Sequence, residues 1–312
     1  MGIQIGRWVF MKIAVQTGGI LDRFGIDEGF RIIKEAGFDA VDFNIDHCLS
    51  GYNIKNNICE SVLDRSIPEV LESTRPYKEA AEKYGVTFYQ AHAPFPFYSD
   101  GNDEMNEYLF MIMEKCAAIC DYVDCRYMIV HPAFNGYDKW LEHDDEWKLN
   151  IERYSRLIPA LKKYNVTCCL ENMFTGRDGK IYGAVCSDMY EAAAYIDELN
   201  AIAGEKKFAF CFDTGHALLV GKDVYNALLQ IGDRVEAFHI HDNNGVNDQH
   251  IMPYTGKLDW NRFIMGVKAI GFKGTLSFET FNITNIFDQE LIPDALKLIA
   301  ATGRMFARRI EE

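Results

Sequence analysis

The chain has 312 residues, of which 48% are hydrophobic and 25% are charged, and its formal net charge at pH 7 is −14. This length is sufficient for one large α/β domain or two small ones. So acidic a chain repels nucleic acid and anionic membranes unless a basic patch opposes the overall charge, and the sequence shows neither such a patch nor an apolar run long enough to span a bilayer.

The first ten residues, MGIQIGRWVF, lack the basic start, apolar core and small-residue cleavage site of a secretory signal. We interpret residues 1–10 as an N-terminal extension, because the first convincing strand begins near Met11. The nine cysteines have no zinc-binding spacing, and most lie in apolar or helical stretches. Reduced thiols in a cytoplasmic protein are therefore expected.

Strand and helix patterns alternate through the first half of the chain. The predicted strands cover residues 12–17, 39–45, 86–94 and 126–132. The predicted helices cover residues 27–37, 68–84, 103–122 and 144–164. A long polar loop is expected at 46–63.

The second half repeats the scheme, with strands predicted at 165–173, 207–215, 235–242 and 274–281. The helices that follow them are predicted at 188–199, 223–232, 259–271 and 288–312. Eight strand–helix units without a linker predict one (β/α)₈ TIM-barrel domain over residues 1–312. A doubly wound open sheet is the alternative, but QTGGILDRFG after the first strand lacks the G-x-G-x-x-G phosphate turn.

Polar side chains stand at the ends of six consecutive predicted strands, which is where a barrel carries its chemistry. In strand order they are His92, His131, Glu171, Asp213, the pair His239 and His241, and Glu279. A single histidine at a strand end is usually a hydrogen-bonded core residue, and Asp213 alone could be a helix cap. Neither explanation accounts for six in succession.

Strand alternation indicates which of these side chains point inward. In 207–213, Ala209 and Cys211 share a face with Asp213, whereas three phenylalanines occupy the opposite face. The same reasoning turns Glu171, His239 and Glu279 inward. Three converging carboxylates repel one another unless a cation lies between them. These four residues are therefore predicted to bind one divalent ion, Mn²⁺, Mg²⁺, Co²⁺ or Zn²⁺.

Eight short segments carry a resemblance to a known family. They are AHAPF (91–95), VHP (130–132), LEN (170–172), DTGH (213–216), HIHD (239–242), DQH (248–250), GKLDW (256–260) and FET (278–280). In this order they resemble the xylose-isomerase-like TIM-barrel family, which groups sugar and sugar-phosphate isomerases and epimerases with inosose dehydratases and endonuclease IV. The resemblance implies metal ligation by Glu171, Asp213, His239 and Glu279, and proton exchange with substrate by the two glutamates.

The same resemblance leaves a nuclease alternative open. Endonuclease IV holds three zinc ions with nine ligands, and matching residues are His92, His131, Glu171, Asp213, His216, His239, Asp248, His250 and Glu279. The net charge disfavours DNA as a substrate. In the favoured interpretation the protein acts on a sugar, and the residues outside the single-metal set contact that sugar. These expected substrate contacts are His92, His131, His216, His241, Asp248, His250 and Lys257. A sugar-binding barrel without enzymatic activity is the third alternative.

The protein is thus expected to be a metal-dependent isomerase or epimerase, and Mn²⁺ is the expected metal. Its expected substrate is a sugar, sugar phosphate or inosose, which would react through an enediolate. A related lyase or dehydratase is the neighbouring alternative. In the family that the chain resembles, free-ketohexose 3-epimerases carry an arginine after the seventh strand. Residues 243–257 contain no arginine, and Lys257 is their one lysine. This difference disfavours a free ketohexose as the substrate. Phe95, Phe97 and Tyr98 are either a sugar-facing wall or loop packing. No nucleic-acid or membrane partner is expected, and self-association is left open.

Overall fold

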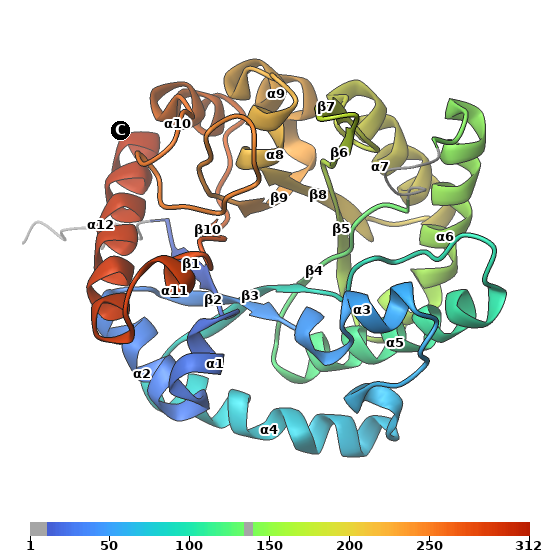
Figure 1. Cartoon of the computed structure of the whole chain (residues 1–312), viewed down its shortest axis with the longest axis horizontal. Helices are drawn as coiled ribbons and strands as arrows, with labels where there is room; N and C mark the ends of the chain where they lie inside the picture. Colours follow the sequence, from blue (N-terminus) through green and yellow to red (C-terminus); the bar gives the residue numbers. More distant parts are fainter. Residues whose placement is uncertain (1–10, 134–139) are drawn as a thin grey trace, which may run out of the picture.

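The computed structural model describes residues 11–133 and 140–312, so the expected extension at 1–10 lies outside the described residues. Eight parallel strands form the centre of the molecule (Figure 1). They are β1 (Ile13–Gln16), β2 (Ala40–Asn44), β3 (Thr87–His92), β4 (Tyr127–Ile129), β5 (Thr167–Glu171), β8 (Phe208–Asp213), β9 (Val235–His239) and β10 (Leu276–Phe278). A parallel bridge between Ile240 and Phe278 joins the two outermost strands. The predicted TIM barrel is confirmed.

The long helices form the outer ring that Figure 1 shows around the strands. They are α2 (Ile26–Ala36), α4 (Ile67–Tyr84), α5 (Asp103–Tyr122), α6 (His143–Lys163), α7 (Met189–Ala203), α9 (Val224–Ile231), α10 (Trp260–Ala269) and α12 (Ile292–Glu311). Side chains that accept hydrogen bonds from the first turn start several of them, such as Asn102, Asp188 and Asp259. The helix boundaries expected from the sequence therefore agree closely with the structure.

The two faces of each strand pack in different layers. The barrel interior holds a cluster of mostly small side chains: Tyr127, Ile129, Cys169, Ala209, Cys211 and Ala237. Phe208, Phe210 and Phe212 belong instead to the large core between the strands and the helices. The predicted alternation of 207–213 is thus observed, and it leaves Asp213 on the interior side.

Shorter elements lie between the barrel strands and the long helices in the sequence. They are α1 (Ile20–Phe24), α3 (Gly51–Lys55), α8 (Thr214–Leu219), α11 (Ile283–Ile286), a hairpin of β6 (Phe174–Arg177) and β7 (Lys180–Gly183), and 3₁₀ turns at Asp46–Cys48, Val62–Asp64, Gly232–Arg234 and Gln289–Leu291. The expectation of a plain loop at 46–63 was wrong, because Ser50 caps α3 within it. The strand expected to reach residue 215 stops at Asp213, which caps α8.

All nine cysteines are free thiols, and seven are buried. Burial raises the pKa of the Cys168 and Cys211 thiols, so these two side chains behave as small apolar groups. Among the described residues, no helix combines the length and the apolar character needed to cross a bilayer.

Candidate metal centre and active site

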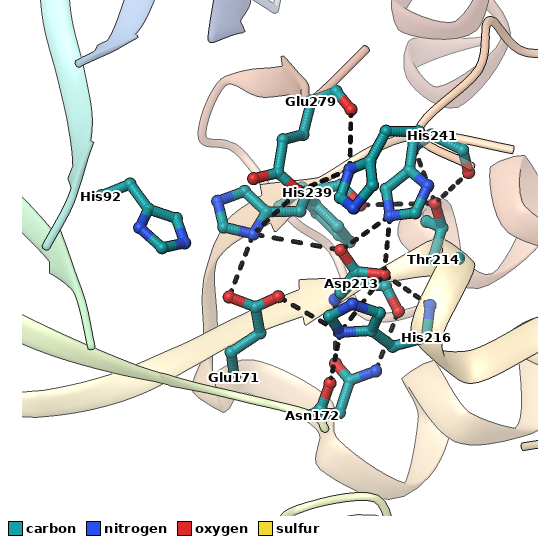
Figure 2. Close-up of polar contacts among 12 residues, drawn as sticks. His92, Glu171, Asn172, Asp213, Thr214, His216, His239, His241 and Glu279 are labelled. Atoms are coloured by element: carbon teal, nitrogen blue, oxygen red, sulfur yellow. Dashed lines mark hydrogen bonds and ion pairs between the residues drawn. The ribbon is translucent and has the colours of Figure 1, made fainter. Parts of the chain in front are cut away.

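The polar strand ends meet in one cavity of about 500 Å³ at the carboxyl ends of the strands. Its lining includes seven of the side chains expected at the site: His92, His131, Glu171, His216, Asp248, His250 and Glu279. Asp213 and His239 lie just beneath this lining and are fully buried. Figure 2 shows the Glu171, Asp213 and Glu279 side chains around His239.

One nitrogen of His239 is surrounded by carboxylates. Its Nδ1 atom lies 3.1 Å from Glu171 Oε2, 3.6 Å from Glu279 Oε2 and 4.0 Å from Asp213 Oδ2. Neither His239 Nδ1 nor Glu171 Oε2 has a hydrogen-bond partner in the described residues, although both are buried. Unpartnered buried polar atoms are costly, and a divalent cation among these four residues would satisfy them. The donor set, three carboxylates and one imidazole, fits the predicted metal.

Asp213 is both a helix cap and a member of this set. Its Oδ1 atom accepts a hydrogen bond of 2.6 Å from the backbone N–H of His216, which starts α8. Its Oδ2 atom accepts a bond of 3.0 Å from His241 Nε2. The Asn172 side chain bonds to both the N–H and the C=O of Asp213 and fixes its backbone. The cap and ligand interpretations of Asp213 are therefore compatible.

A second polar group adjoins the first. Asp248 Oδ2 lies 2.8 Å from His250 Nε2 and 3.4 Å from His216 Nε2, and His250 Nδ1 lies 3.2 Å from Glu279 Oε2. The ligand atoms of four side chains here lie within 4.8 Å of one another, namely those of His216, His241, Asp248 and His250. The geometry would allow a second ion here.

A third group lies beside Glu171. His92 Nδ1 donates to the carbonyl of Ala93, so in the neutral ring its Nε2 accepts, at 3.0 Å, from His131 Nε2. His131 Nε2 is also 3.1 Å from Glu171 Oε2. Burial lowers the pKa of His131 against the opposing effect of Glu171. These three residues could also share an ion.

Neighbouring histidines favour the ionised forms of the two candidate proton-transfer residues. Burial would raise the pKa of Glu171, but His239 and His131 outweigh burial and hold it well below its usual value. Burial likewise opposes ionisation of Glu279, and His239 and His250 lower its pKa. Gln16 Nε2 donates a hydrogen bond of 2.7 Å to Glu279 Oε1, and the other carboxylate oxygen, Oε2, faces His239 and His250. Both groups can therefore accept a proton.

His216 gives the metal-free protein a specific pH dependence. Burial disfavours its charged form, but Asp213, Asp248 and Glu171 raise its pKa from 6.5 to about 10. Because the pKa of His216 is higher in the folded than in the unfolded chain, its protonated form stabilises the fold. This stabilisation is fully present below the unfolded-state pKa of 6.5 and is lost as the pH rises through the folded-state pKa of about 10. We expect the Tm of chelator-treated protein to fall across this window in thermal denaturation. A His216→Asn variant should show a flatter profile, and an equally steep one would contradict this assignment.

The structure does not bring two expected substrate contacts into the cavity. His241 is fully buried, donates to Asp213 and stacks on His250 with ring centroids 3.9 Å apart, so it supports Asp213 instead of facing a ligand. Lys257 is exposed and is absent from the cavity lining, and its backbone N–H donates to the carbonyl of Asn243. Neither residue lines the cavity, and a contact between either of them and a substrate stays a prediction.

The expected aromatic wall is only partly present. Phe95 lines the cavity and lies 4.5 Å from the His131 ring, whereas Phe97 is buried against Phe110 in the outer core. Phe174 and Phe281, which the sequence did not single out, also line the cavity. They lie 5.0 Å from His216 and 4.3 Å from His250, respectively. Three phenyl rings thus each cover one histidine of the site.

Sequence reasoning also missed two buried polar residues, one on β2 and one on β3. Asp42 on β2 bonds to His239, and Gln90 on β3 bonds to Asp42. A signal existed, because Asp42 shares its strand face with Asn44, and Gln90 shares its face with His92. An acidic residue in the middle of an otherwise apolar strand indicates a buried polar contact, and Asp42 is such a residue.

Comparison with known proteins agrees with the barrel fold. Protein MJ1311 of Methanocaldococcus jannaschii, whose activity is uncharacterized, is 27% identical over 307 residues, covering 94% of this chain and 92% of that protein. Similar solved structures include 3-keto-D-glucoside 4-epimerase YcjR from E. coli, with TM-score 0.67, 16% identity and coverage of 93% of this chain and 99% of that chain. The IolI protein with a bound zinc atom gives TM-score 0.64, 16% identity and 96% coverage of both chains. At these identities the solved structures show a shared fold.

The family model described as xylose isomerase-like TIM barrel matches residues 30–302. The match includes β2 to β10 and every strand-end residue of the candidate site. The chain therefore belongs to the xylose isomerase-like TIM barrel family.

Proposed function

We propose that the protein is a divalent-metal-dependent sugar isomerase or epimerase. The observation that carries this proposal is the unpartnered Nδ1 of His239 among Glu171, Asp213 and Glu279, directly beneath an open cavity. Figure 2 shows the two glutamates on opposite sides of His239. The similar folds that act as epimerases, and the zinc in the IolI structure, support the same reaction class.

The chemistry follows from the residues around the cavity. A divalent ion held by Glu171, Asp213, His239 and Glu279 would polarise a substrate carbonyl and acidify the adjacent C–H. One glutamate accepts that proton and the other returns a proton to the substrate. Return to the opposite face of the same carbon gives an epimer, and return to the neighbouring carbon gives aldose–ketose exchange. Loss of a β-oxygen instead would make the protein a lyase.

The cavity walls suit a carbohydrate. Phe95, Phe174 and Phe281 offer apolar surfaces for the C–H faces of a sugar ring, and Asn44 and Asp46 offer polar groups for its hydroxyls. His92, His131, His216, Asp248 and His250 are proposed as further contacts to the substrate. A sugar, a sugar phosphate and an inosose are all candidates.

A second function is favoured by one observation. Three groups of potential ligands lie at the cavity or just beneath it: His92 with His131 and Glu171, His239 with its three neighbouring carboxylates, and His216 with His241, Asp248 and His250. Such a set could hold more than one ion, as phosphodiester hydrolysis by an endonuclease IV-like mechanism requires. The net charge of −14 opposes DNA binding, and we therefore place this function second.

Metal analysis combined with solvent exchange separates the two functions. We expect one divalent ion per chain after gentle purification, and deuterium at the α carbon when ketoses, inososes or sugar phosphates are incubated in D₂O. Three zinc ions per chain with cleavage of abasic DNA would favour the nuclease. A chain that takes up no metal after reloading would refute the proposed centre.

A further inference from the structure

Asp42 is an acid with no exposed surface in the middle of β2. Its Oδ2 atom accepts hydrogen bonds from Gln90 Nε2 at 2.9 Å and from His239 Nε2 at 3.1 Å. Its Oδ1 atom has no hydrogen-bond partner, and His239 is its one ion-pair partner in the described residues. A buried carboxylate with so few partners destabilises the fold. Its presence therefore indicates a role at the site that it contacts.

The hydrogen bonds around Asp42 determine which nitrogen of His239 carries hydrogen. Gln90 Nε2 also donates to the carbonyl of Phe238 at 3.1 Å, so two acceptors fix the orientation of this amide. A carboxylate can only accept, and the bond between Asp42 and His239 therefore places the hydrogen on Nε2. In the neutral imidazole, Nδ1 then carries the lone pair.

That lone pair faces the carboxylates of the candidate metal centre. His239 Nδ1 is 3.1 Å from Glu171 Oε2 and 3.6 Å from Glu279 Oε2. A lone pair directed at carboxylate oxygens is repulsive unless a cation lies between them. Asp42 thus holds the ring in the one tautomer in which Nδ1 is a metal ligand.

The contact also crosses the barrel. β2 and β9 are not neighbours in the sheet, since β1 and β10 separate them, yet Asp42 and His239 meet inside the barrel. A hydrogen bond between a ligating histidine and a carboxylate fixes the ring and makes it a stronger ligand. We propose that Asp42 is the positioning residue that orients His239 for metal binding, a role that rests on the proposed metal centre.

The test measures metal affinity directly, by competition between the protein and a chromophoric chelator for Zn²⁺. Asp42→Leu removes the acceptor and should lower the affinity by about 10–100-fold. Asp42→Asn keeps an acceptor oxygen but loses the charge, so it should fall between Asp42→Leu and the parent protein. The matched control is Ser277→Ala, which alters an equally buried side chain whose hydroxyl has no hydrogen-bond partner in the described residues.

A second readout does not depend on affinity. In ¹⁵N-histidine NMR of the Zn²⁺-loaded parent protein, His239 should retain its Nε2 hydrogen and show a shifted Nδ1 resonance, and Asp42→Leu should lose this pattern. Unchanged affinity and an unchanged Nε2 hydrogen in Asp42→Leu would overturn the role of Asp42 while the metal centre stands. A parent protein that binds no Zn²⁺ would overturn the metal centre itself, and this role with it.

Discussion

Replacement of Glu279 by glutamine should lower the rate of substrate deuteration by about 10²–10⁴-fold while it weakens metal binding much less. The glutamine keeps a carbonyl oxygen that can coordinate a cation, but it cannot accept a proton. It can also keep the bond from Gln16, because the amide oxygen accepts as the carboxylate does. The measurement is deuterium wash-in at the α carbon, with Mn²⁺ titrated from trace to saturating concentrations.

Asp213→Asn is the matched control for this experiment. Asparagine is as good a helix cap as aspartate, so the bond that starts α8 is retained and the fold is preserved. Asp213 lies beneath the cavity lining instead of on it, and its loss should therefore act through the metal. Excess Mn²⁺ should rescue Asp213→Asn in part and Glu279→Gln hardly at all. Equal rescue of both variants would mean that Glu279 is only a ligand.

The fold was predictable because each strand–helix unit can be recognised from residues that are close together in the sequence. Most strands are short apolar runs, and several long helices begin at a capping side chain and end at a glycine, as with Asp188 and Gly204 of α7 and Asp223 and Gly232 of α9. These signals depend on near neighbours in sequence. The small interior residues Ala209 and Cys211 then identified which strand face turns toward the barrel axis.

The hairpin of β6 and β7 was missed although its turn is visible in the sequence. Asp178 and Gly179 both have positive φ, 52° and 72°, as a two-residue hairpin turn requires. Aspartate followed by glycine is a recognised sequence for such a turn. The flanking strands are short and half-exposed, so they lack the apolar run by which the barrel strands were identified. This omission also hid Phe174, whose ring covers His216.

The candidate site was predictable only in part. Alternation along single strands located Glu171, Asp213, His239 and Glu279, because each of these positions depends on its own strand. Contacts across the barrel produce no local sequence pattern, because the two partners can be far apart in the chain. Asp42 and His239, for example, are 197 positions apart. Likewise, His241 shares a strand face with His239, and only the packing against Asp213 and His250 shows that it is enclosed.

Replacement of His239 by alanine should abolish metal binding, whereas replacement of His241 by alanine should only weaken it. His239 Nδ1 faces three carboxylates, so its loss removes a ligand. His241 reaches the centre only by donating to Asp213, whose other oxygen stays fixed by the N–H of His216. The loss of such a supporting hydrogen bond typically lowers metal affinity by about 10–100-fold.

Metal content after exhaustive dialysis, followed by chelator competition, distinguishes these two histidines. His143→Ala is the control, because this histidine is 68% exposed at the start of α6 and pairs with Glu191 away from the cavity. Circular dichroism verifies that each variant is folded. We expect His143→Ala to bind metal like the parent, His241→Ala to bind it at higher metal concentration, and His239→Ala to remain at background. If His241→Ala loses metal as completely as His239→Ala, the bond to Asp213 is not a support, and the ligand set must include His241.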